Sequence, residues 1–240
     1  MMTKPLTAEE WGGHYNTSLV EGLMAALRQK EYLWQTQQML ELTSVGESVL
    51  EVGSGTGATS LALALSGRKA TALDFAQPCL DLAVLAATRL ECPIDVVLAD
   101  ATQELPFEDS AFDWVFQAGL LEHFERETRV QLLKNWGRVA SRMVSIIPNA
   151  ASIAYRYGKA RMEKNGSWPY GLELPQYSLK NEFLEAGYKV TDEFTIGEEH
   201  SLTFLPRWHP LRQILKWWIK QNDEDNCGQG YLLVTIGERI

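Results

Sequence analysis

The sequence predicts an α/β protein with a doubly wound, mostly parallel β-sheet. Apolar strand-like runs alternate with helix-compatible segments over residues 48–148, a pattern typical of this class. A glycine-rich turn follows the first run, and an acidic residue follows both the second and the third. We therefore expect a core of five strands separated by four helix-compatible segments, with two more β segments at residues 188–196 and 231–236.

The first strand and the turn after it carry the main functional signal. Residues 49–52 are apolar apart from Glu51, which suits a parallel strand buried on both faces. Gly53, Gly55 and Gly57 follow, and glycines let a backbone turn sharply and approach a ligand closely. A helix is predicted at residues 58–66, with Gly67 as its C-terminal stop. The turn therefore lies at a helix N-terminus and predicts a nucleotide-cofactor site.

The glycine spacing separates two kinds of cofactor. Dinucleotide sites use Gly-x-Gly-x-x-Gly, whereas this chain has Gly53-x-Gly55-x-Gly57 followed by Ala58, so a variant dinucleotide site stays an alternative. The carboxylate of Glu51 suits an ammonium group better than a pyrophosphate. The motif resembles the first motif of the class I methyltransferases of the small-molecule type, which use S-adenosylmethionine.

The resemblance extends over the next strands and implies further cofactor contacts. It assigns the ribose hydroxyls to Asp74, at the end of the strand predicted at 70–74; the alternative is a cap for the helix that follows. Residues 105–113 resemble the family's "LPF-x-D-x-x-FD" segment, and residues 120–124 its "LEH" turn. The predicted cofactor contacts are Glu51, Gly53, Ser54, Gly55, Gly57, Asp74, Phe75, Asp100, Ala101, Gln117 and Tyr15.

Candidates for acceptor chemistry are fewer. His123, just past the strand at 112–117, is the best-placed general base, because imidazole titrates near neutral pH; the alternative is a packing role. Trp168 and Tyr170 are predicted substrate contacts, because Pro169 stiffens the loop that carries them. The alternative is a loop that its aromatic side chains pack onto the sheet.

Composition favours a single enzyme domain over residues 1–240. The net charge of -9 and the lack of a basic stripe argue against a nucleic-acid partner. We expect no signal peptide and no membrane span. The three cysteines lack metal-binding spacing, so we also expect no metal site and a cytoplasmic location. The oligomeric state stays open.

Three segments outside the core are expected to shape the acceptor pocket. They are a mostly helical cover at residues 7–43 and two insertions at residues 149–177 and 198–229. The basic amphipathic helix at residues 211–220 is predicted to be a lid or an association face, with a membrane-surface helix as the alternative. The expected function is methyl transfer from S-adenosylmethionine to a small molecule; the alternatives are a nicotinamide-dependent oxidoreductase and a non-catalytic S-adenosylmethionine-binding protein.

Overall fold

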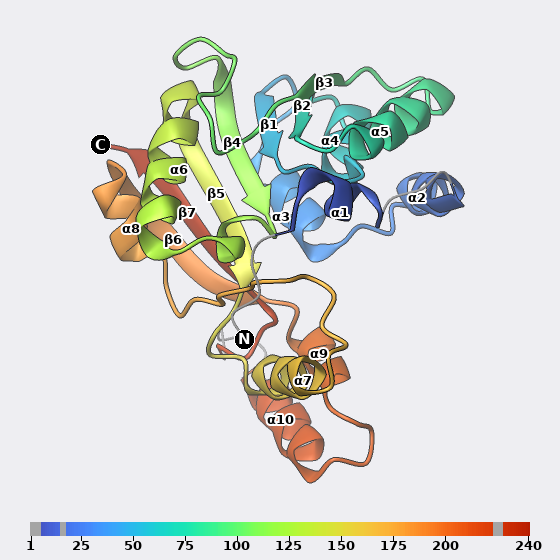
Figure 1. Cartoon of the computed structure of the whole chain (residues 1–240), viewed down its shortest axis with the longest axis vertical. Helices are drawn as coiled ribbons and strands as arrows, with labels where there is room; N and C mark the ends of the chain where they lie inside the picture. The colour runs from blue at the N-terminus through green and yellow to red at the C-terminus, as the bar shows by residue number, and fades with distance from the viewer. Residues whose placement is uncertain (1–5, 15–17, 223–227) are drawn as a thin grey trace.

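A seven-stranded sheet forms the centre of the computed structural model, which describes residues 6–14, 18–222 and 228–240 (Figure 1). The strand order is β3-β2-β1-β4-β5-β7-β6. The strands are β1 (Ser48–Val52), β2 (Lys69–Asp74), β3 (Asp95–Leu98), β4 (Phe112–Ala118), β5 (Ala140–Pro148), β6 (Tyr188–Ile196) and β7 (Leu232–Arg239).

The sheet is parallel except at one strand. β1 pairs in parallel with β2 and β4, and β7 runs antiparallel between β5 and β6. The predicted doubly wound, mostly parallel fold is therefore confirmed. The parallel arrangement places the carboxyl ends of β1, β2 and β4 at one edge of the sheet, where ligands bind in folds of this type.

Helices and short turns connect the strands. The helices are α1 (Ala8–Gly12), α2 (Ser18–Gln29), α3 (Trp34–Leu42), α4 (Ala58–Leu65), α5 (Gln77–Arg89), α6 (Arg126–Val139), α7 (Ile153–Lys164), α8 (Lys180–Glu185), α9 (Glu198–Ser201) and α10 (Pro210–Gln221), with 3-10 turns η1 (Leu121–His123) and η2 (Leu202–Phe204). Helix α4 begins after Gly57 and ends before Gly67, which has φ +83°, as the sequence predicts.

Both faces of the sheet are buried under helices. In β1, Leu50 packs with Leu133 and Trp136 of α6, while its neighbour Val49 packs on the opposite face with Leu63 of α4 and Met39 of α3. Because successive strand residues point to opposite faces, a strand covered on both sides is apolar throughout. This explains the unbroken apolar run around the first motif.

One predicted connection is wrong. The expectation of four helix-compatible connections fails at residues 99–111, which form turns without a helix. Pro106 lacks a backbone N–H, and side chains of α6 bind the loop's carbonyl groups instead. Arg138 donates to the carbonyls of Leu105 and Phe107, and Trp136 Nε1 donates to that of Ala101.

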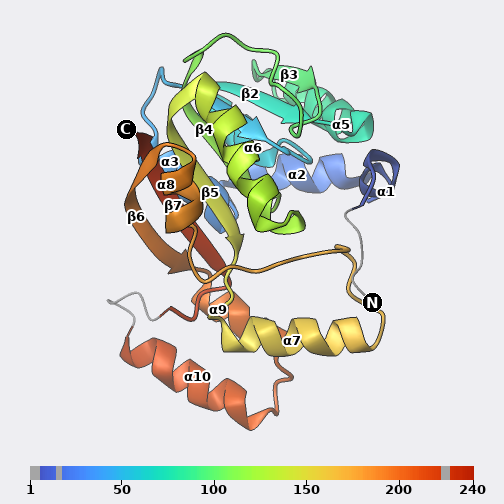
Figure 2. The ribbon, with the colours of Figure 1, turned by 60° about the vertical axis from the view of Figure 1, so that its left-hand side comes forward.

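The segment at residues 7–43 contains helices α1, α2 and α3, which lie against α4 and α5. Helices α7, α9 and α10 form a separate group beyond the carboxyl ends of β4 and β5 (Figures 1 and 2). Leu215 and Ile219 of α10 pack there against Leu202 and Leu205. Within the described ranges, no helix is both long and apolar enough to cross a membrane.

Candidate functional site

A cavity of about 260 Å³ lies at the carboxyl ends of β1, β2 and β4. The residues that line it come from the glycine-rich turn, the ends of β2 and β3, the turn after β4, and helices α1 and α6. They are Leu6, Trp11, Gly53, Gly55, Leu73, Asp74, Phe75, Cys79, Asp100, Ala101, Thr102, Ala118, Gly119, Leu120, His123, Phe124, Leu132 and Trp136. Most of the predicted cofactor contacts are thus brought together in one cavity.

The glycine-rich turn has the backbone conformation that its sequence requires. Gly53, Gly55 and Gly57 have φ of +71°, +53° and +68°, a region that other residues rarely adopt. A Cβ at Gly53 would lie 3.0 Å from Leu120 Cδ2. Gly57 does not line the cavity; a Cβ there would lie 2.9 Å from Ala83 Cβ, so it allows α4 and α5 to pack closely.

Asp74 ends β2 with its carboxylate at the cavity. Oδ2 accepts a hydrogen bond from the Gly55 backbone N–H at 2.9 Å, and Oδ1 accepts one from that of Ala76 at 2.9 Å. Burial raises the pKa of Asp74, although these N–H donors oppose the shift. Each oxygen keeps a second lone pair, so the carboxylate can accept two hydroxyl groups.

Residues that follow β3 form another wall of the cavity. Asp100 Oδ1 accepts hydrogen bonds from the backbone N–H and the hydroxyl of Thr102, which fixes the orientation of the carboxylate. Ala101 lines the cavity beside it, and Phe75 is 39% exposed at the same cavity. The walls are otherwise largely apolar, as a flat heteroaromatic ring requires.

Two predicted contacts of the first motif lie behind the cavity wall. Glu51 accepts hydrogen bonds from the backbone N–H and the hydroxyl of Ser60 in α4, and burial raises its pKa to about 7. The Ser54 hydroxyl is buried without a hydrogen-bond partner among the described residues. Neither residue lines the cavity, so their contact with a cofactor stays a prediction.

Gln117 also lies behind the wall. Its Oε1 accepts from the backbone N–H groups of Leu120 and Leu121, and its Nε2 donates to Ser145 Oγ at 2.6 Å. The side chain therefore holds the turn after β4 in place. A direct cofactor contact by Gln117 stays a prediction that this geometry does not favour.

His123 lines the cavity and contacts residues 171–177, a segment called the strap. Nδ1 of His123 lies 2.5 Å from the Leu172 carbonyl oxygen, and the Leu174 N–H donates to the Glu122 carbonyl oxygen at 2.7 Å. In both contacts a backbone group of the strap binds a residue of η1, so the two contacts hold the strap against this turn. His123 is buried, and burial lowers its pKa, while backbone carbonyl groups around the ring oppose the shift.

Trp11 of α1 is a cavity residue that the sequence analysis does not predict. Its ring lies 5.5 Å from the ring of His123 and stacks at 6.5 Å on that of Tyr170. The aromatic residues between positions 11 and 16 carry the available signal, but the prediction falls on Tyr15, which lies outside the described residues. Trp168 and Tyr170 do not line the cavity themselves; Tyr170 reaches it only through Trp11.

A buried acidic pair, Glu122 of η1 and Glu173 of the strap, lies where the strap meets η1. Glu122 is 2% exposed, and its Oε2 has no hydrogen-bond partner in the described part of the chain. Burial and the neighbouring Glu173 raise the pKa of Glu122 well above its usual range. Glu173 accepts a hydrogen bond from the Tyr155 hydroxyl, and burial raises its pKa to about 7. The carboxyl group of Glu173 can therefore hold a proton near neutral pH.

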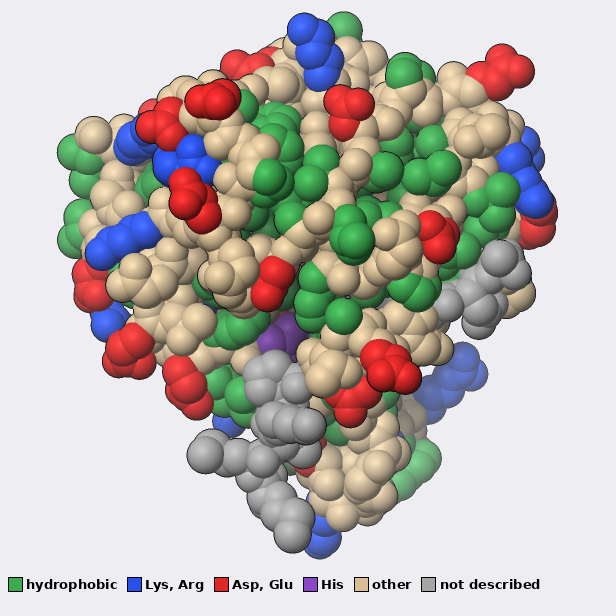
Figure 3. All heavy atoms as spheres, turned by 45° about the horizontal axis from the view of Figure 1, so that its top comes forward, with side chains coloured by type: hydrophobic (Ala, Val, Ile, Leu, Met, Phe, Trp, Pro, Cys, Tyr) green, Lys and Arg blue, Asp and Glu red, His purple; other side chains and the backbone are tan. Residues whose placement is uncertain are grey.

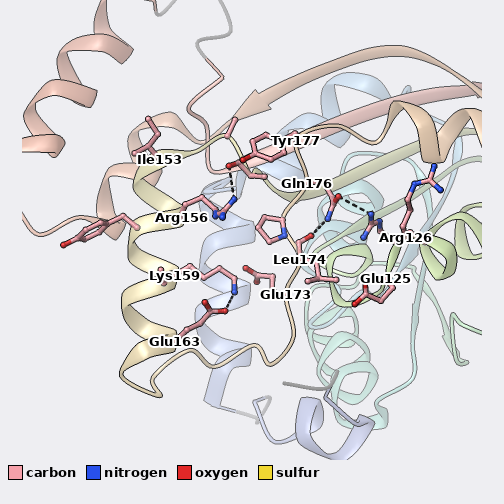
Figure 4. Close-up of a pocket in the computed structure, with 16 residues that line it drawn as sticks. Glu125, Arg126, Ile153, Arg156, Lys159, Glu163, Glu173, Leu174, Gln176 and Tyr177 are labelled. Carbon is pink, nitrogen blue, oxygen red and sulfur yellow. Dashed lines mark hydrogen bonds and ion pairs between the residues drawn. The ribbon is translucent and has the colours of Figure 1, made fainter. Parts of the chain in front are cut away.

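An open groove of about 1140 Å³ runs between α7 and the strap. Figure 4 shows Arg156 and Lys159 of α7 on one side and Glu173, Leu174 and Gln176 of the strap on the other. The Lys159 ammonium pairs with Glu163 and lies 4.9 Å from the centre of the Trp168 ring. Glu173 thus belongs both to the groove and to the buried acidic pair.

Charges of both signs lie on the face shown in Figure 3. On the face shown in Figure 3, Lys and Arg side chains are scattered among Asp and Glu side chains, without a continuous basic stripe. Among the residues that the structure covers, no group of three or more His, Cys, Asp or Glu side chains could hold a metal ion.

Comparisons with known proteins agree with this geometry. Residues 49–142, from β1 into β5, match a family model described as "Methyltransferase domain". A demethylmenaquinone methyltransferase from Clavibacter sepedonicus is 38% identical over 88 residues, which are 35% of this chain and 34% of that protein. A cypemycin N-terminal methyltransferase from a Streptomyces species is 32% identical over 99 residues, 39% of this chain and 37% of that protein.

Solved structures resemble the chain over a longer range. A magnesium protoporphyrin IX methyltransferase from Synechocystis, with bound SAH, has a TM-score of 0.60 at 14% identity and covers 92% of this chain and 87% of that chain. The matches to the two curated relatives span only about a third of their length.

The fold is Rossmann-like, and its cavity lies at the carboxyl ends of β1, β2 and β4. Residues 49–142 are similar to the methyltransferase-domain family, and the chain as a whole has the fold of the Rossmann-like methyltransferases.

Proposed function

We propose that the chain is a methyltransferase that uses S-adenosylmethionine and acts on a small-molecule acceptor. The observation that carries this proposal is the position of Asp74, which ends β2 at the cavity beside Gly53 and Gly55. A carboxylate there suits the two hydroxyl groups of a ribose. The SAH in the structure from Synechocystis supports the same cofactor class.

The residues around the cavity fit such a cofactor. Asp74 would accept the ribose hydroxyls, and Asp100 with the Ala101 backbone would meet the adenine beside Phe75. The buried Ser54 hydroxyl lacks a partner among the described residues and lies between Gly53 and Gly55, which both line the cavity. Bound S-adenosylmethionine supplies a methyl group that its sulfonium already activates.

The protein's own contribution would be alignment of the acceptor and exclusion of water. Trp11 lines the cavity and stacks on Tyr170, which covers the outer side of its ring. The groove between α7 and the strap is large enough for an organic acceptor. We assign the cofactor to the smaller cavity and the body of the acceptor to this groove, with the acceptor's reacting atom reaching the cavity, because the methyl group passes directly from sulfur to acceptor.

Proton removal has two candidates. His123 is neutral near pH 7, because burial lowers its pKa, so its Nε2 can act as a base while Nδ1 faces Leu172. Glu173, which lines the groove, is the second candidate, because burial raises its pKa to about 7, a value that suits proton exchange near neutrality. An acceptor that carries no proton at the reacting atom needs neither.

A labelling experiment tests the function. The protein is incubated with methyl-labelled S-adenosylmethionine and a fractionated cell extract, and the label is followed into small-molecule, protein and nucleic-acid fractions. We expect label in the small-molecule fraction with wild type and, from the loss of a charged acceptor, at least about tenfold less with Asp74→Ala. Label confined to protein or nucleic acid would contradict the small-molecule acceptor. No transfer despite tight cofactor binding would favour the non-catalytic alternative.

A further inference from the structure

Helix α10 and the residues before it present large apolar side chains to solvent. Trp208 is 81% exposed, Ile214 60%, Trp217 62% and Trp218 46%. The last three lie at positions i, i+3 and i+4, so they share one side of α10. The opposite side is already used, since Leu215 and Ile219 pack in the cluster with Leu202 and Leu205.

The same segment is basic within an acidic protein. Residues 200–222 contain Arg207, Arg212, Lys216 and Lys220 and no Asp or Glu, whereas the whole chain has a net charge of -9. Arg207, Lys216 and Lys220 are exposed. Arg212 instead donates to two carbonyl groups of the segment at 202–205, which fixes α10 on η2. The acidic residues at 223–225 follow in the sequence and lie outside the described residues.

We propose that this apolar-basic face, formed by Trp208, Ile214, Trp217 and Trp218 with Arg207, Lys216 and Lys220, docks the protein on an anionic membrane surface. The arrangement of the side chains matches an interface between lipid and water, where tryptophans enter the headgroup region and lysines meet anionic lipids. Charge complementarity selects the occupant: the acidic remainder of the chain is repelled by such a surface, so the protein would dock through this face only.

The position of α10 makes this contact possible. In Figures 1 and 2 the helix lies at the end of the molecule farthest from β1, β2 and β3, so a flat surface can reach it. The face continues onto α7 through ring contacts. The Trp208 ring contacts the His209 ring, and the centre of the His209 ring lies 4.9 Å from the centre of the Tyr157 ring in α7. Tyr157 lines the groove. If the groove holds the acceptor, which rests on the proposed function, the docked protein would meet acceptors carried by the membrane.

The helix predicted at residues 211–220 corresponds to α10. None of its residues lines the cavity or the groove, so it is not a lid over either of them. A membrane-surface role gives the exposed apolar side of α10 a binding partner, whereas a lid role would leave that side in solvent.

Co-sedimentation with vesicles tests the proposal without any methyl-transfer assay. We expect wild type to bind vesicles of mixed phosphatidylglycerol and phosphatidylcholine, to bind pure phosphatidylcholine at least about tenfold more weakly, and to dissociate as salt is raised. The double variant Lys216→Ala/Lys220→Ala should lower the partition coefficient about 25-fold, from about fivefold per cation. Trp217→Ala/Trp218→Ala should lower it about tenfold or more.

Matched controls and rival outcomes complete the experiment. Lys134→Ala/Lys189→Ala removes two exposed cations elsewhere, and Leu33→Ala/Leu184→Ala removes two exposed leucines elsewhere; neither should change binding. Unchanged melting temperatures show that the variants fold. Equal binding to neutral and anionic vesicles, or no binding, overturns the proposal. So does a dimer that the tryptophan variant dissociates, because the face would then be occupied by a second copy.

Discussion

His123 is hydrogen-bonded to the strap: its Nδ1 lies 2.5 Å from the carbonyl oxygen of Leu172. The two residues are far apart in the sequence, and the contact joins the turn after β4 to the strap, which lines the groove. His123 also lines the cavity, so the same side chain contacts both the strap and the cavity.

Two substitutions at His123 separate these roles. His123→Asn keeps an N–H donor near the position of Nδ1, whereas His123→Ala removes it. We expect His123→Ala to increase hydrogen exchange in the strap and His123→Asn to change it little. If the acceptor is a hydroxyl or a carbon acid and His123 is the base, both variants should lower turnover by about 10²–10⁴-fold. Turnover of His123→Asn within about tenfold of wild type would leave the residue only its positioning role.

Asp74→Ala should weaken binding of S-adenosylhomocysteine by about 1.5–3 kcal/mol, roughly 10–150-fold, because hydrogen bonds to a charged acceptor are lost. The control is Asp81→Ala, which removes an exposed carboxylate of α5 that bonds only to exposed Gln77 among the described residues. Calorimetry measures both variants. Equal affinities of the two would remove Asp74 from the site.

Gly57→Ala should destabilise the protein more than Gly46→Ala. Both glycines have positive φ, at +68° and +89°, so both substitutions carry the backbone cost of about 1–2 kcal/mol. Only at Gly57 would the new Cβ meet a neighbour, Ala83 Cβ at 2.9 Å, whereas nothing lies within 4 Å at Gly46. Denaturant unfolding compares the two; equal losses would show that α4 and α5 do not need this close contact.

Glu51→Gln should change how stability depends on pH. Burial raises the pKa of Glu51 from 4.5 to about 7, so between these values the folded state holds a proton that the unfolded state releases. The free energy of unfolding of wild type therefore falls, through this group, between about pH 4.5 and about pH 7.

The Gln variant lacks this loss. Its stability relative to wild type should rise across that range by up to about 3 kcal/mol and stay constant above it. Glu41→Gln, at an exposed position of α3, is the control. A pH-independent difference for Glu51→Gln would show that Glu51 is ionised throughout.

Much of the cavity could be predicted because it depends on local pattern. A buried strand, glycines at positive φ and an acid at the next strand end are consecutive features, and Gly53, Gly55 and Asp74 line the cavity as the motif implies. Side-chain direction was harder to predict. Glu51 turns toward Ser60 and Gln117 toward the turn after β4, because buried polar groups bind the nearest backbone donors.

Contacts between residues far apart in the sequence could not be predicted. Trp11 meets His123 and Tyr170 only after the N-terminal helix packs over the sheet, and no spacing rule connects these residues. The strap docks through the carbonyl of Leu172 and the N–H of Leu174, and backbone groups leave no residue signature. The loop at 99–111 is held by α6 side chains, so its own sequence did not exclude a helix.

Calorimetric titration of the wild-type chain with S-adenosylhomocysteine and, separately, with NADH tests the central claim most directly. We predict binding of one S-adenosylhomocysteine per chain, lost with Gly55→Val because a branched side chain would fill the space of the cofactor, and no binding of NADH. Binding of NADH without binding of S-adenosylhomocysteine would contradict the cofactor assignment and favour the oxidoreductase alternative.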